Sequence, residues 1–131
     1  MIKKIPIQAT YRKDNGLWNL NTDSLPLPEG FVVKERNIVY IPAGEFGGNH
    51  KHRHTEALVG VGDDLFIIWH DEDGRRHEHR MMDGEQLYFF IVEPFTPHVV
   101  VNRGTSFAVL AELTDDFRRD VEQVEVLNSG E

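Results

Sequence analysis

The segment GGNHKHRHTE, residues 47–56, places a titratable side chain at every second position: His50, His52, His54 and Glu56. Imidazole nitrogens and carboxylate oxygens are common ligands of divalent transition metals. In a β-strand, residues two apart lie on the same face, with Cβ atoms roughly 6.5–7 Å apart. Two histidines at this spacing can reach one ion at about 2.0–2.2 Å. An exposed polar strand would show the same alternation, so the spacing alone leaves both interpretations open.

A carboxylate and a distant histidine favour the metal interpretation. Glu56 lies four residues beyond His52 and can reach the same ion if the strand bends between them. The same bend would turn His54 outward. Far along the chain, VEPFTPHVVVN (residues 92–102) places His98 after a proline-bounded turn, at the start of an apolar strand. A buried histidine needs a partner, and a metal site needs a ligand from a neighbouring strand, so we expect His98 to complete the site.

The elements that must position these residues are short strands. Turn signals recur along the chain, and the segments between them are rich in β-branched and aromatic residues; they include FVVKERNIVYI, EALVGV, LFIIWH, LYFFIVE, HVVVN and FAVLAEL. Short strands with frequent turns are typical of an antiparallel sandwich or barrel. HDEDGR, at 70–75, predicts a tight hairpin. The sequence therefore predicts an all-β fold with little or no helix.

The C-terminal segment is the one place where a helical turn competes with a strand. Asp115 or Asp116 could cap a short helix, whereas VEQVEVL alternates apolar and polar residues with a period of two. We expect one short helical turn followed by a strand.

Two segments of the sequence resemble the two signature motifs of the cupin superfamily. The first motif matches Gly44, His50, His52, Glu56 and Gly62; the second matches Gly84, Pro94, His98 and Asn102. Two departures stand out: Phe95 occupies the place of a glycine in the family's turn, and the last gap of the first motif is one residue short. The match covers residues 44 to 104, and strands fit before and after it.

The resemblance implies one cupin domain over residues 1–131, a jelly-roll β-barrel with a divalent metal inside. The strands at 1–43 would precede the barrel motifs at 44–113, and 114–131 would form a C-terminal segment. The implied ligands are His50, His52, Glu56 and His98, with Fe, Mn, Ni or Zn as the ion. Such a set leaves one or two positions open for water or substrate. His54 has no counterpart among the family's ligands, so we expect it to touch a ligand side chain or to be exposed.

Residues for a substrate pocket and for proton transfer are less well defined by the sequence. The pocket candidates are Phe46, Trp69, Phe90, Phe95 and Asn102, although most aromatic rings pack in the core. The candidate acids or bases are Tyr88 and Glu112.

The cupin fold hosts many reactions, so the function must be argued from the pocket. The first hypothesis is an enzyme acting on a small carbonyl or hydroxyl compound, and the histidine segment is similar to the cupin branch of sugar and sugar-nucleotide isomerases and epimerases. A dioxygenase using Fe(II) is an alternative. A non-catalytic, metal-dependent module that binds a sugar or an organic acid is another.

Composition narrows the remaining options. The chain has 131 residues, a formal charge of −8 and no cysteine, which excludes thiolate ligands and argues against nucleic acid as a partner. No apolar run is long enough for a membrane span or a signal peptide, so we expect a cytoplasmic protein with a small-molecule ligand. The alternating N-terminal segment IKKIPIQATYRK could pair with a second copy in a homodimer.

A second His-x-His pair, His77 and His79, belongs to the run GRRHEHR after the predicted hairpin. Flanking arginines favour a solvated edge strand over a second metal site. We interpret His70, before the same turn, in the same way.

Overall fold

The computed structural model describes residues 1–117 and 121–127. The prediction of an all-β fold is confirmed, because this part of the chain contains strands and one 3₁₀ turn, Thr22–Ser24. The strands, in chain order, are β1 (Ile2–Ile7), β2 (Tyr11–Arg12), β3 (Trp18–Asn19), β4 (Glu35–Ile41), β5 (Phe46–His52), β6 (Glu56–Val61), β7 (Leu65–His70), β8 (Arg76–Arg80), β9 (Met82–Asp83), β10 (Gln86–Val92), β11 (His98–Asn102), β12 (Ala108–Thr114) and β13 (Val121–Gln123). No helix among these residues is long and apolar enough to cross a membrane.

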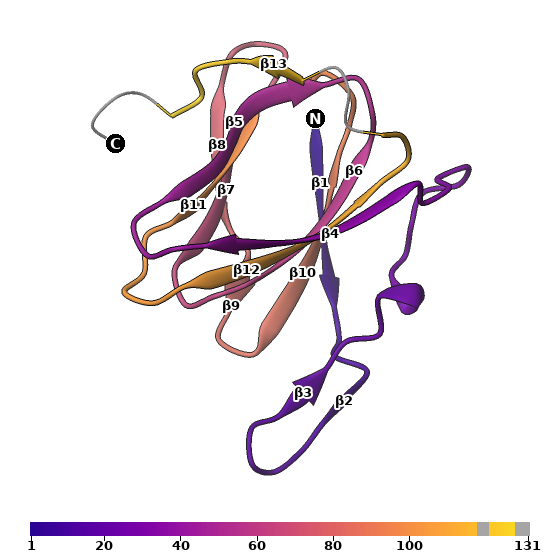
Figure 1. The fold of residues 1–131 in the computed structure, drawn as a ribbon, viewed down its shortest axis with the longest axis vertical. Helices are drawn as coiled ribbons and strands as arrows, with labels where there is room; N and C mark the ends of the chain where they lie inside the picture. The colour runs from indigo at the N-terminus through magenta and orange to yellow at the C-terminus, as the bar shows by residue number, and fades with distance from the viewer. Residues whose placement is uncertain (118–120, 128–131) are drawn as a thin grey trace.

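Two antiparallel sheets face each other in a jelly-roll arrangement (Figure 1). One sheet has the order β1-β10-β6-β12-β4, with β9 paired to β10, and the other has the order β13-β5-β11-β7-β8. The hairpin of β2 and β3 lies away from both (Figure 1). The predicted hairpin at 70–75 joins β7 to β8, with Gly74 at a φ of 78°.

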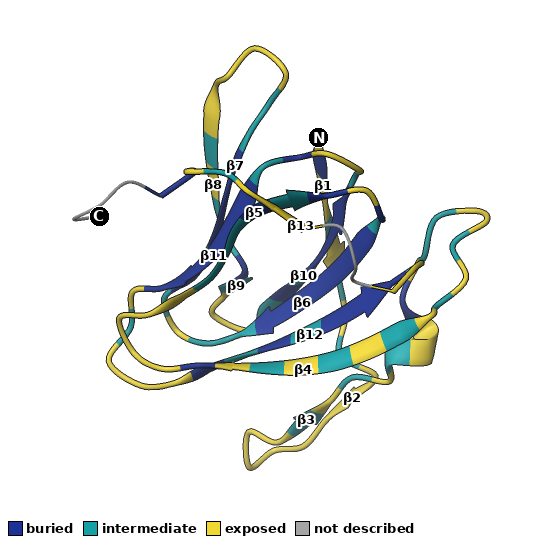
Figure 2. Cartoon of the chain, turned by 45° about the horizontal axis from the view of Figure 1, so that its top comes forward, coloured by how far each residue is buried: buried dark blue, intermediate teal, exposed yellow. Residues whose placement is uncertain are grey.

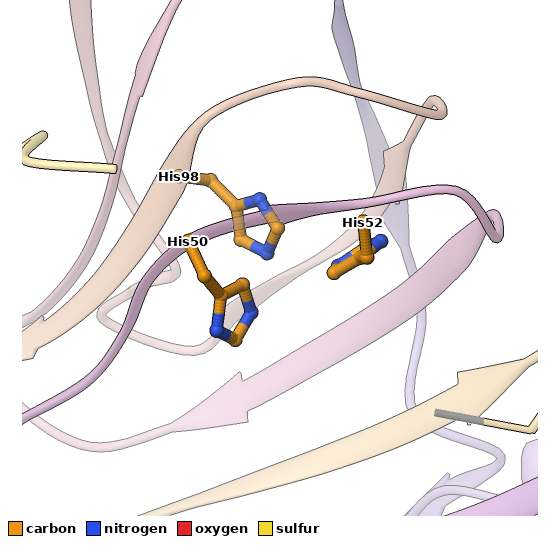
Figure 3. Close-up of side chains that lie close together, drawn as sticks. All are labelled: His50, His52 and His98. Carbon is orange, nitrogen blue, oxygen red and sulfur yellow. The ribbon is translucent and has the colours of Figure 1, made fainter. Parts of the chain in front are cut away.

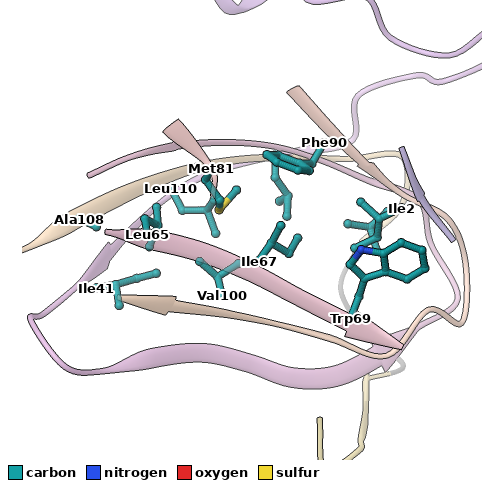
Figure 4. Packing of buried hydrophobic residues seen from close by; sticks show 12 residues of the cluster. Ile2, Ile41, Leu65, Ile67, Trp69, Met81, Phe90, Val100, Ala108 and Leu110 are labelled. Carbon is teal, nitrogen blue, oxygen red and sulfur yellow. The ribbon is translucent and has the colours of Figure 1, made fainter. Parts of the chain in front are cut away.

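The space between the sheets holds the main hydrophobic core. Inward-facing side chains of both sheets meet there, among them Leu58, Ile67, Phe90 and Leu110 (Figure 4). A second cluster covers the outer face of the first sheet, because Leu25 of the N-terminal segment packs on that side. Strands β6, β10 and β12 are therefore largely buried, whereas β4, at the sheet edge, alternates between partly buried and exposed residues (Figure 2).

The C-terminal segment completes the second sheet. Strand β13 pairs with β5, and Val126 and Leu127 pack on the outer face of the same sheet. The predicted terminal strand is confirmed at Val121–Gln123. The predicted helical turn is absent from residues 115–117, and the rest of that prediction, at 118–120, lies outside the described residues.

Candidate metal centre

A bulge in β5 sets the first two histidines in place. Val99 pairs with Gly48, but the residue before it, His98, pairs with His50. Asn49 is therefore the extra residue in β5. Asn49 adopts a φ of 65°, and a bulge of this kind re-aims the side chains that follow it. Gly48, at a φ of 107°, also needs to be glycine, since a Cβ there would lie 3.2 Å from the His98 carbonyl oxygen. The bulge places His50 directly opposite His98.

The rings of His50, His52 and His98 point toward one space between the sheets (Figure 3). Their centroids are 4.9–5.3 Å apart: 5.3 Å for His50 and His52, 5.0 Å for His50 and His98, and 4.9 Å for His52 and His98. One nitrogen of each ring lies within 4.8 Å of the other two. Two nitrogens on one zinc-sized ion are at most about 4.2 Å apart, twice a bond of ~2.1 Å. Small ring rotations would therefore bring all three onto a common ion.

Glu56 reaches the same cluster from the opposite sheet. The chain bends at residues 53 and 54, and Glu56 then begins β6. Its carboxylate oxygens lie 3.1 Å from His52 Nε2 and 3.7 Å from His98 Nε2. The structure thus brings together the four side chains expected as metal ligands.

His54 does not turn outward, as had been expected from the bend, but touches proposed ligand side chains, which was the other expectation. It is 6% exposed, its ring stacks on that of His52 at 3.9 Å, and its Nε2 lies 3.3 Å from Glu56 Oε2. The bend at residues 53 and 54 therefore leaves His54 on the same side of the chain as His52. His52, His54 and Glu56 thereby form a second group that could share an ion.

The electrostatics of the cluster favour a cation. Burial raises the pKa of Glu56, but contacts with His52, His54 and His98 outweigh it and hold the pKa well below its usual value. Glu56 is therefore a carboxylate buried among imidazoles. A buried negative group of this kind needs positive charge nearby, which a divalent ion supplies.

The histidine nitrogens are arranged as ligands. The backbone carbonyls of His54 and Thr96 lie 3.0 Å from His52 Nδ1 and 2.8 Å from His98 Nδ1. A carbonyl only accepts, so each Nδ1 donates to it, and Nε2 is left as the nitrogen that could bind a metal. His52 Nε2 is buried and makes no hydrogen bond of suitable geometry, although Glu56 Oε2 lies 3.1 Å away, and metal coordination would satisfy it. The donor set fits a divalent transition metal.

The cluster opens into a cavity of about 90 Å³. Its lining comprises Val39, Ile41, Gly47, Gly48, His50, Glu56, His98, Val100, Leu110 and Glu112. Glu112 lies on the inward face of β12, is 5% exposed and pairs with Leu58, two residues beyond Glu56 on β6. Among the described lining residues, Glu112 is the ionisable group that is not a predicted ligand.

The other predicted pocket residues lie elsewhere. Trp69 and Phe90 belong to the core, and Trp69 pairs with His98. Phe46 and Phe95 are 48% and 60% exposed. Tyr88 packs partly against the core, and the Lys4 ammonium lies 4.1 Å from the centre of its ring.

Asn102 has a structural role in the loop after β11. Its amide group donates to the carbonyls of Ile41, Pro42 and Ser106, and its oxygen accepts from Gly104 N–H. Those bonds use both ends of its side chain. Val39, Ile41 and Leu110 also line the cavity but were not predicted to do so; their inward position could have been found from the alternation of β4 and β12.

Comparisons with known proteins identify the fold. No protein-family model matches the chain, and no curated protein matches it. Solved structures match with 11–18% sequence identity. A dTDP sugar isomerase from Desulfovibrio desulfuricans G20 is 15% identical over 96% of this chain and 82% of its own, with a TM-score of 0.67.

Two further structures carry the same arrangement. A mutant of the 3,4-ketoisomerase QdtA from Thermoanaerobacterium thermosaccharolyticum, in complex with TDP-4-keto-6-deoxyglucose, is 11% identical over 91% of this chain and 83% of its own, with a TM-score of 0.63. The capsular polysaccharide assembling protein CapF from Staphylococcus aureus is 18% identical over 70% of this chain, with a TM-score of 0.63. The match spans only 28% of CapF. With two facing antiparallel sheets and these neighbours, the chain has the fold of the cupin superfamily.

Proposed function

We propose that this chain is a metal-dependent cupin enzyme that acts on a small carbonyl or hydroxyl compound. The observation that carries the proposal is the convergence of His50, His52, His98 and Glu56 on one side of a cavity that holds a further carboxyl group. We propose these four residues as ligands of one divalent ion, with Fe, Mn, Ni and Zn as candidates. When bound, such an ion polarises a substrate oxygen and makes the neighbouring C–H bond more acidic.

Glu112 is our proposed acid and base. It lines the same cavity as His50, Glu56 and His98 but lies on a different strand from all of them. On an α-hydroxy carbonyl compound, a carboxylate there can take the proton from the hydroxyl-bearing carbon and return it to the former carbonyl carbon. The hydroxyl proton passes to the former carbonyl oxygen, so the carbonyl and hydroxyl groups exchange places without net gain or loss of electrons. Tyr88, the other candidate from the sequence, is not among the described residues that line the cavity.

The structural neighbours support an isomerase. Two of them are named as a sugar isomerase and a sugar ketoisomerase, and sugar or sugar-nucleotide isomerisation is one reaction of the class that Glu112 could serve. Glu112 can transfer protons, which favours isomerisation over oxygenation. Oxygenation is supported only by the set of proposed metal ligands, which also suits iron.

A metal-loading experiment tests the proposal. The protein is prepared with Zn(II), Mn(II), Ni(II) or Fe(II), and its metal content, solvent deuterium incorporation into candidate keto compounds, and O₂ uptake are measured. We expect one ion per chain and deuterium incorporation with several metals. Oxygen uptake with iron alone would contradict the isomerase proposal and identify the protein as a dioxygenase. Ligand-induced stabilisation without either reaction would identify a binding module.

We also propose a homodimer. In the described part of the chain, β1 pairs with β10 on one side only, so its other edge is open, and open edges favour strand pairing with another chain. Light scattering at micromolar concentration would give twice the chain mass of 15.1 kDa; a mass of one chain would refute the dimer.

A further inference from the structure

We infer that the substrate is a compact compound that binds through two neighbouring oxygen atoms and carries a short aliphatic arm, such as an α-hydroxy ketone, with 2-oxo acids such as 2-oxobutanoate as unreactive analogues. The inference rests on the proposed function, because it concerns the ligand of the same centre. It comes from the chemical nature and the size of the cavity beside the four proposed ligands.

Branched aliphatic side chains form the wall of the cavity next to these ligands. Val100 lies two residues beyond His98 on the same face of β11, and Leu110 and Val39 pair across β12 and β4. Ile41 follows Val39 on the inward face of β4. Val100, Leu110 and Ile41 are 3%, 3% and 2% exposed. A ligand group that leaves the ion in this direction meets hydrocarbon.

The volume limits what fits. The cavity holds about 90 Å³, whereas an apolar cavity of roughly 150 Å³ accommodates one benzene molecule. An ion and the ligand oxygens bound to it take part of that space, since one water alone needs roughly 10–15 Å³ of such a cavity. The remainder suits an arm of a few carbon atoms.

A polar arm would fit this wall poorly. Among the described lining residues, Glu112 is the side chain other than the proposed ligands that could accept a hydrogen bond from such an arm. A hydroxyl group buried without a hydrogen bond costs about 1–3 kcal/mol in proteins, and a sugar ring carries several, most of which would face hydrocarbon. An aliphatic arm gains free energy in the same place, about 0.8 kcal/mol for each CH₂ group removed from water. The aliphatic wall therefore favours substrates with an apolar arm. The open coordination positions of the ion would favour substrates with two neighbouring oxygen atoms.

Two probes of equal size separate these effects. 2-Oxobutanoate and hydroxypyruvate share the 2-oxo acid group, and they differ in an arm that ends in CH₃ or in OH. Titration calorimetry on the zinc-loaded protein should give 2-oxobutanoate an affinity about 10-fold or more above that of hydroxypyruvate. Equal affinities, or tighter binding of hydroxypyruvate or of dTDP-glucose, would overturn the inference.

A substitution at the wall tests the cause of the preference. Val100→Thr keeps the size of the side chain but adds a hydroxyl group facing the cavity, so we expect the preference for 2-oxobutanoate to fall by about 3-fold or more. Val109→Thr is the matched control, because Val109 neighbours Leu110 on β12 but does not line the cavity. An unchanged preference in Val100→Thr would contradict a role for this wall.

Metal content, measured on the same samples, keeps the two proposals apart. A chain that binds no divalent ion refutes the proposed function and, with it, the chelating part of this inference. A chain that holds one ion but favours the polar arm refutes the aliphatic substrate and leaves the metal centre standing.

Discussion

Two His-x-His pairs lie within strands on one face of the same sheet, and they have different surroundings. His50 and His52 lie on β5, and His77 and His79 lie on β8. The spacing is identical, and both pairs face inward, since His77 pairs with Trp69 of the core. The first pair belongs to the candidate metal centre. Within the described chain, the second pair belongs to no group of three potential ligands.

The neighbouring strand makes the difference. Beside β5, strand β11 supplies His98, and the bend after β5 supplies Glu56. Beside β8, strand β7 supplies Trp69, whose ring stacks on His77 at 4.2 Å and 15°. His77 also lies 2.8 Å from Asp71, which lowers the pKa of that carboxyl group. A pair of histidines thus becomes a metal site only when other strands bring a third and a fourth ligand.

The prediction for β8 was partly correct. The strand is at the edge of its sheet, as expected, but its histidines are half-buried instead of solvated. Burial, followed by the charges of Lys4 and His77, lowers the pKa of His79. The aromatic surface of Trp69 gives these side chains a partner that the sequence pattern did not reveal.

The largest expected effect comes from His98→Ala. His98 and His77 flank Trp69 on opposite sides, so His77→Ala is a matched control. Loss of a direct ligand should weaken zinc binding by more than about 100-fold, above the 10–100-fold range for groups that only support ligands. His77→Ala should change it by less than about 2-fold. Similar losses in both variants, measured by competition with a chelator, would remove the distinction between the pairs.

Glu112→Gln tests the chemistry separately from the metal. The amide keeps the size of the side chain but cannot accept the proton, so turnover should fall by about 10²–10⁴-fold while zinc content stays at one ion per chain. Glu78→Gln is the control, since Glu78 lies on β8 and contacts Arg103. Turnover of Glu112→Gln within about 3-fold of the original would exclude Glu112 as the base.

Asn49→Ala tests the bulge in β5, which is the feature that positions the first pair of histidines. The Asn49 side chain accepts from Val126 and Leu127 N–H at 2.7 Å and donates to the Leu127 carbonyl at 3.2 Å. Its loss leaves backbone groups unpaired, so we expect the free energy of unfolding to fall by about 1–3 kcal/mol and zinc affinity to fall about 10-fold.

Asn37→Ala is the control for the bulge variant, because Asn37 bonds only locally, to Glu35. Denaturant unfolding and zinc titration measure both quantities. If Asn49→Ala lost stability but kept full zinc affinity, the bulge would not be what positions the histidines.

The smallest effect is expected at Phe95, in the turn before His98. Phe95 adopts a φ of 64°, which a non-glycine residue adopts at a cost of about 1–3 kcal/mol. Phe95→Gly removes that cost but adds entropy to the unfolded chain, so the free energy of unfolding should rise by about 0.5–1 kcal/mol. Phe46→Gly, at the exposed start of β5, should lower it. A loss of stability in Phe95→Gly would mean that its exposed ring makes a contact worth more than the strain.

The fold could be predicted because strand length and turn residues are local patterns, and the four-residue cluster because the spacings in two segments resemble the cupin motifs. Strand length and turn residues predicted the sheets, and the spacing of His50, His52 and Glu56 predicted the bend that follows β5. The bulge at Asn49 has no comparable signal, because its cause is a hydrogen-bonding partner 77 residues away at Val126. The position of His54 depended on how sharply the chain bends, which the spacing does not specify.

The pocket was harder to predict than the ligands for a physical reason. Aromatic residues were natural candidates, yet Trp69 and Phe90 fill the core, where their large apolar surface gains most from burial. Asn102 matches its motif, but its polar side chain is used by the loop. Smaller aliphatic residues line the cavity, and only the pairing of strands shows which of them face it.

Anomalous diffraction from a zinc-grown crystal, at energies on either side of the zinc edge, tests the metal centre most directly. The account predicts one strong peak, about 2.0–2.2 Å from nitrogens of His50, His52 and His98 and from an oxygen of Glu56. A peak between His77 and Asp71 instead, or no peak while the four side chains bind only water, would contradict it.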